Sequence, residues 1–123
     1  MFTRKPVRKS GNLSALNHAV AIDASRLALL AIFVKATAVT ATLTVEGSWN
    51  STNGVDGDWR QIAISPSNST NLYTQVATIA LTANPTISWT ARVTPFTWVR
   101  VRVSTFTSAT ALEATLVGLN ATV

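Results

Sequence analysis

Few side chains in this sequence could support catalysis. The chain has one histidine, His18, so a histidine-based triad would have to use it, with Asp23 or another acid as partner. There is no cysteine, which excludes thiolate nucleophiles and Cys-based zinc sites. Asp56 and Asp58 could in principle form the carboxylate pair of a glycoside hydrolase, but Asp is also favoured in Gly-rich turns such as theirs. This inventory predicts a protein that is not an enzyme and that uses no cofactor.

The same acidic segment is the weak candidate for a metal site. Asn53, Asp56 and Asp58 could offer oxygens to a calcium ion, which takes about six to eight of them. The segment 53–58 does not match the spacing of an EF-hand loop and lacks its distal Glu. We therefore expect an ordinary turn here and no bound metal.

Basic residues are concentrated at the N-terminus. Four cations lie in the first nine residues: Arg4, Lys5, Arg8 and Lys9. Three interpretations are open, namely a disordered tail, weak salt-sensitive binding of nucleic acid, and docking onto an acidic neighbouring subunit. Pro6 favours an extended conformation suited to docking. We treat residues 1–12 as a flexible basic arm and expect its four cations to bind a partner.

Tryptophans supply the remaining candidates for binding. Trp59 and Trp89 fall in strand positions with apolar neighbours, so we expect them in the core. Trp49 opens the loop 49–58, and Trp98 shares a strand face with two arginines, which favours cation–π contacts or an interface. Four residues are therefore expected to contact a ligand or partner: Trp49, Trp98, Arg100 and Arg102.

The elements that must position these side chains are strands. Apolar residues take every second position in 39–46, and the same alternation appears in 87–93 and 98–103. The segment 26–35 contains the continuous apolar run 27–34, so a buried helix stays open beside a central strand, which Ile32-Phe33-Val34 favours. Further strands are expected at 16–22, 59–64, 72–81 and 110–117. Together they predict an all-β fold, a single antiparallel β-sandwich or jelly roll of about eight strands spanning 13–123.

The composition indicates assembly. Charged residues make up 12% of the 123 residues, about half of the roughly 25% usual in soluble domains. A surface covered by other subunits explains this shortage, and a secreted Thr- and Ser-rich β-domain is the alternative. We expect no signal peptide, because polar residues separate the basic segment from the first apolar run. That run, 27–34, is also too short to span a membrane.

Three short motifs resemble those of the galactose-binding-like (discoidin-type) jelly roll. They are Val45-Glu46-Gly47-Ser48, Asp56-Gly57-Asp58-Trp59, and Trp98-Val99-Arg100-Val101-Arg102-Val103. The resemblance spans 43–103, about half of the chain. Similar short β-sandwich sequences occur among phage virion proteins, including decoration and fibre-base proteins. The lack of cysteine favours that virion version over a secreted lectin.

These observations predict a structural virion protein on the capsid surface, made in the host cytoplasm. We expect a decoration (cement) protein that binds the major capsid protein or other virion proteins through its sandwich and its arm. It would form a homo-oligomer, a trimer or a dimer, and would not bind membranes. Two alternatives stay open. One is a carbohydrate-binding module of a phage tail or cell surface, and the other is a small viral coat subunit whose arm contacts nucleic acid.

Overall fold

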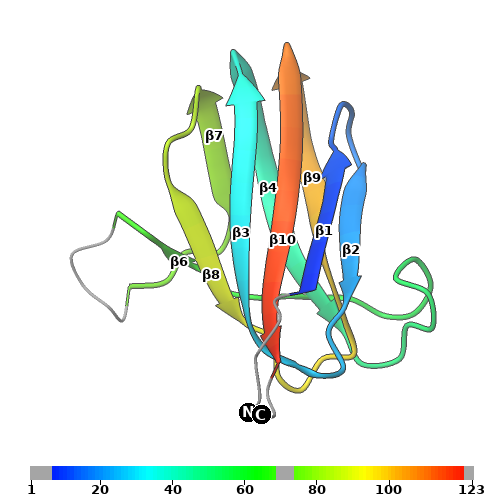
Figure 1. Ribbon diagram of the computed structural model, residues 1–123. Coiled ribbons are helices and arrows are strands. Elements are labelled where there is room, and N and C mark those ends of the chain that lie inside the picture. The colour runs from blue at the N-terminus through cyan, green and yellow to red at the C-terminus, as the bar shows by residue number, and fades with distance from the viewer. Residues whose placement is uncertain (1–6, 69–73, 121–123) are drawn as a thin grey trace.

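The computed structural model describes residues 7–68 and 74–120 (Figure 1). Within these ranges the chain contains strands and no helix. No helix that could cross a membrane is therefore found there. The strands are β1 (Val7–Asn12), β2 (Ala19–Asp23), β3 (Leu27–Thr37), β4 (Val39–Ser48), β5 (Arg60–Gln61), β6 (Ser65–Pro66), β7 (Ile79–Ala83), β8 (Ser88–Arg92), β9 (Trp98–Ser108) and β10 (Ala111–Asn120).

The strands form two antiparallel sheets packed face to face. Sheet A has the order β1-β10-β3-β8-β6, and its outer face is turned toward the viewer in Figure 1. Sheet B has the order β2-β9-β4-β5, with β7 also paired to β4. The predicted antiparallel β-sandwich is thus confirmed. It has ten strands in its described part rather than about eight, because β1 and the two-residue strand β6 were not expected.

The core lies between the sheets and follows the period of two. Sheet B contributes alternate residues of β4 and β9, among them Leu43, Val101 and Val103, all fully buried. Sheet A contributes Leu30 and Leu116 from its two central strands, also fully buried. The alternation predicted for 39–46 and 98–103 is therefore the alternation between core and outer face.

The segment 26–35, for which a helix and a strand were both open, lies in the strand β3 from Leu27 onward. Ile32 and Val34 point into the core, while Leu29 and Phe33 point to the outer face of sheet A and are about half exposed. Both faces of β3 are apolar, so the sequence shows no alternation there. The segment pairs with β10 on one side and β8 on the other, as a central strand does.

Several predicted strands have different limits, and β9 and β10 extend beyond the predicted 103 and 117. The strand expected at 16–22 begins at Ala19, because Asn17 has a positive φ of 69° and forms part of a turn. Of 59–64 only β5 is paired in a ladder, although Ile62 and Ile64 are still buried. The strand expected at 72–81 begins at Ile79, and residues 72 and 73 lie outside the described residues.

The prediction of a flexible arm is wrong for residues 7–12, which form the edge strand β1. Its partner is β10, with register from Val7 opposite Gly118 to Asn12 opposite Glu113. Ser10 and Thr115 also share a hydrogen bond between their hydroxyls, at 2.9 Å. Backbone pairing with β10 needs no apolar pattern, which is why the composition of this segment did not predict a strand. Residues 1–6 lie outside the described residues.

Candidate interaction surfaces

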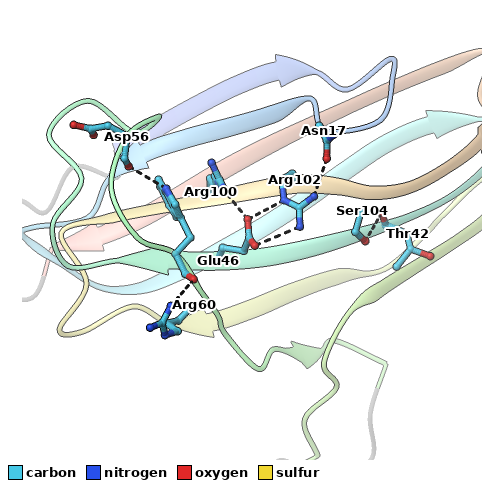
Figure 2. Close-up of polar contacts among 9 residues, drawn as sticks. Asn17, Thr42, Glu46, Asp56, Arg60, Arg100, Arg102 and Ser104 are labelled. Carbon is cyan, nitrogen blue, oxygen red and sulfur yellow. Dashed lines mark hydrogen bonds and ion pairs between the residues drawn. The ribbon is translucent and has the colours of Figure 1, made fainter.

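A carboxylate flanked by two arginines organises the outer face of sheet B (Figure 2). Glu46 on β4 accepts hydrogen bonds from Arg100 Nε at 2.9 Å and Arg102 Nε at 3.0 Å, both on β9. The register places Glu46 directly opposite Arg100, and Arg102 is two residues further on the same face. Burial alone would raise the pKa of Glu46, but the bonds and charges of Arg102 and Arg100 outweigh burial, so this pKa lies below its usual value.

The two arginines extend this network to the neighbouring segments. Arg102 Nη1 donates to Asn17 Oδ1 at 2.9 Å, which fastens the turn before β2. The guanidinium of Arg100 lies 4.0 Å from the centre of the Trp59 ring, a cation–π contact. Trp59 Nε1 in turn donates to the carbonyl oxygen of Asp56, which connects it to the loop before β5 (Figure 2). Trp59 is therefore half-buried on this outer face and not in the core as predicted, whereas Trp89 is buried in the core.

Loop 49–58 is held by its own polar side chains. Asp56 accepts hydrogen bonds from the backbone amide and hydroxyl of Thr52, at 2.7 and 2.6 Å, and from the Ser51 hydroxyl at 2.8 Å. These bonds lower the pKa of Asp56 to about 2. Asp58 accepts a bond from Asn50 at 2.9 Å. Both carboxylates thus act as turn-forming groups, and the described residues contain no cluster of three or more His, Cys, Asp or Glu suited to a metal.

The tip of this loop packs onto sheet B at Gly54. Gly54 has a φ of +84°, and a Cβ at this position would lie 2.8 Å from the ring of Trp98 and 3.0 Å from Ala21. Trp98 is accordingly half-buried between the loop and the sheet. Trp49 at the start of the loop stays 48% exposed, with the Arg60 guanidinium 5.1 Å from its ring centre. The two tryptophans predicted as contacts thus differ, since Trp49 is about half exposed while Trp98 is largely covered by the loop.

A shallow groove of about 440 Å³ lies beside Trp98, bounded by β1, β2, β9 and loop 49–58. Ala19 and Ala21 are among its small lining residues. Its polar lining brings two cations and two amides together: Lys9, Arg100, Asn17 and Asn53. Such an arrangement suits a small anionic ligand with an apolar side.

The predicted partner-binding cations do not act as one group. Arg8 and Lys9 are consecutive in β1 and therefore point to opposite sides, Arg8 to the outer face of sheet A and Lys9 to the groove. Arg4 and Lys5 lie outside the described residues. Arg100 and Arg102 do come together, and sequence reasoning missed Glu46 as their shared partner. Glu46 is the one acid in β4, which pairs with the strand that carries both arginines. This position could have indicated the ion pairs.

The outer face of sheet A carries an apolar patch that the sequence did not reveal. Leu29, Phe33 and Leu119 are 48%, 49% and 42% exposed on adjoining strands. Leu29 lies opposite Leu119 in the register. Ala31 and Val117 form the next cross-strand pair and complete the patch. We call these five residues of β3 and β10 the apolar patch.

Comparison with known proteins bears on the fold. No family model matches the sequence, and no curated protein sequence matches it. The SPBc2 prophage-derived protein YomS superposes with a TM-score of 0.68 at 8% identity, over 98% of this chain and 99% of that one. IMPa from Pseudomonas aeruginosa, solved with an O-glycopeptide, aligns over 12% of its length at 17% identity. Its TM-score of 0.42 is too low to indicate a common fold. The first likeness shows that the whole sandwich is shared with a protein of phage origin.

Proposed function

We propose that this chain is a structural protein of a phage particle, a capsid decoration (cement) protein that adheres to the shell and catalyses no reaction. The observation that carries the proposal is the shared fold with a prophage-derived protein over nearly the full length of both chains. The surface supports the adhesive part. Only 12% of the chain's residues are charged, and the outer face of sheet A carries an exposed apolar patch. Such a surface is suited to being covered by another protein.

The mechanism would be adhesion by a preformed surface. The sandwich holds its outer faces on paired strands, so docking would order little of the backbone and lose little entropy. Apolar side chains that are half exposed in the free chain would be buried against the shell. A trimer or dimer of the chain would bind several equivalent sites at once and strengthen attachment through multivalency.

Co-sedimentation tests this proposal. Empty shells of the phage or prophage that encodes the chain, assembled without it, are incubated with the purified chain and pelleted. We expect saturable binding at a fixed number of copies per shell and a higher melting temperature of the decorated shell. Absence of the chain from the pellet at micromolar concentration would contradict a role as a decoration protein.

The groove beside Trp98 favours a second candidate, a carbohydrate-binding module. Lys9 and Arg100 could bind the carboxylate of an acidic sugar, and Asn17 and Asn53 could bind its hydroxyls. The resemblance to discoidin-type jelly rolls is in keeping with this candidate. Titration with glucuronate, with glucose as the matched neutral sugar, distinguishes it in amide NMR spectra. Shifts at Lys9 and Asn53 with glucuronate only would support it, and unchanged spectra with both sugars would exclude it.

A further inference from the structure

We propose that the outer face of sheet A, centred on the apolar patch, is the docking face of the chain. Its partner is a different protein of the shell, with an apolar ridge flanked by carboxylates. This inference rests on the proposed function and adds to it which surface binds and what chemistry the partner must present.

The apolar patch lies on strands that are held in place on both sides. β3 and β10 are interior strands of sheet A, each paired on both sides (Figure 1). Their inward residues Leu30, Ile32 and Leu116 are fully buried. The outward residues of the patch can therefore make contacts without rearrangement of the core. A rigid surface of this kind is what a high-affinity interface requires.

Two arginines flank the patch on opposite sides. Arg8 on β1 is the register neighbour of Val117, and Arg92 on β8 is the register neighbour of Leu29. β1 and β8 are three strand spacings apart, about 14 Å. Both arginines are exposed. Among the described residues, ion pairs are formed by Glu46 with Arg100 and Arg102, and no carboxylate lies within 4.0 Å of Arg8 or Arg92. The two arginines are also offset by two residues along the strands, so a partner would match this face with two carboxylates about 16 Å apart across an apolar ridge.

The remaining charges of this face keep it positive. Lys35 on β3 lies opposite Glu113 on β10, and the two offset each other. Arg8 and Arg92 then leave the face with a charge of +2, that is, three cations against one acid. An acidic rim on the partner is therefore favoured both in the bound state and during approach.

A second copy of the chain does not supply such a rim. Glu46 is neutralised by Arg100 and Arg102, and Asp56 is saturated by hydrogen bonds within its loop. Asp23 and Asp58 also accept bonds from neighbouring side chains, and they belong to β2 of sheet B and to loop 49–58. The one acid of sheet A, Glu113, is offset by Lys35, so two copies docked through sheet A would each still present a net charge of +2 to the other. The chemistry of the face thus specifies a different protein as its occupant.

Three variants test the assignment in the shell-binding experiment. Phe33→Ser removes the largest side chain of the patch, and Arg8→Glu combined with Arg92→Glu reverses the two flanking charges. We expect each to weaken binding at least about tenfold, and the charge-reversed variant to lose the salt dependence of wild type. Trp49→Ala is the matched control, because Trp49 is as exposed as Phe33 but belongs to loop 49–58. We expect it to bind within about twofold of wild type, like most contacts outside an interface.

The outcomes separate the inference from the proposed function. If wild type does not bind the shell, the proposed function fails. If wild type binds and Phe33→Ser and the charge reversal bind equally well, only the docking face assigned here is wrong. Sedimentation velocity of the chain alone tests the partner. A dimer of wild type that Phe33→Ser dissociates would overturn the assignment to a different protein, and an oligomer unchanged by Phe33→Ser would support it.

Discussion

The two outer faces of the sandwich differ in how many of their side chains are paired or covered by other residues of the chain. On sheet B, Glu46 pairs with Arg100 and Arg102 (Figure 2). On the same face Trp59 stacks against Arg100, and loop 49–58 packs onto Trp98. On sheet A, leucines and a phenylalanine are exposed between two arginines without ion pairs to the described residues. The polar face stabilises the fold, while the apolar face adds little to stability and is available for a partner.

Among substitutions on the outer faces, the largest effect on stability is expected from Glu46→Gln. This change leaves two partly buried arginines without their counter-charge, and we expect the free energy of unfolding to fall by about 2–3 kcal/mol. Urea unfolding measures it. Glu113→Gln is the matched control, an exposed acid on sheet A, and is expected to change stability by less than about 0.5 kcal/mol. Equal effects of the two changes would contradict the contrast between the faces.

Gly54→Ala should have the next largest effect. The new Cβ would collide with Trp98, and alanine would have to adopt a φ of +84°. We expect a loss of about 2 kcal/mol together with a change in tryptophan fluorescence, because the loop must lift from sheet B. Val55→Ala at the next, 77% exposed position should leave both readouts near wild type. A Gly54→Ala variant of wild-type stability would show that the loop does not pack as described.

Acid should destabilise the sheet B side of the molecule. The folded-state pKa values of Glu46 and Asp56 lie below the usual 4.5 and 3.8. Each group therefore contributes stability that is complete above its unfolded pKa and is lost as pH falls through its folded pKa. We expect the melting temperature to fall from about pH 5 downward. Glu46→Gln should flatten the upper part of this decline, and Asp56→Asn the part between 3.8 and about 2. A decline that both variants leave unchanged would show that other groups control it.

The smallest effect on stability is expected at the apolar patch. Phe33→Ser should lower the free energy of unfolding by only about 1 kcal/mol, because Phe33 is half exposed and lies outside the core. Ile32→Ala, at the adjacent inward position, should cost about 3 kcal/mol. Urea unfolding of both variants compares the two sides of one strand. A large loss for Phe33→Ser would mean that sheet A needs its apolar patch for folding.

The sequence predicted the sheet B side of the sandwich better than the sheet A side. Polar outer residues alternate with core residues in β4 and β9, so period two revealed both strands and the shared face of Trp98, Arg100 and Arg102. In β3 the outer residues are also apolar, which removed the alternation and left a helix open. The same feature concealed the apolar patch.

Other differences arose from tertiary contacts that local patterns do not encode. β1 carries no apolar alternation because it is an edge strand held by backbone bonds to β10. The partnership of Glu46 with both arginines depends on the pairing of β4 with β9, which propensity alone does not specify. Trp59 was placed in the core because its neighbours are apolar, whereas its ring instead packs beneath Arg100 on the outer face.

Hydroxyl-radical footprinting of the chain after incubation with the shell in the proposed binding experiment tests most directly the claim that sheet A is the docking face. Phe33 and Trp49 are 49% and 48% exposed in the free chain, so each is accessible to oxidation before binding. If sheet A is the docking face, oxidation of Phe33 falls on the particle while oxidation of Trp49 is unchanged. Protection of Trp49 with Phe33 still oxidised would contradict the account and would place the contact on loop 49–58.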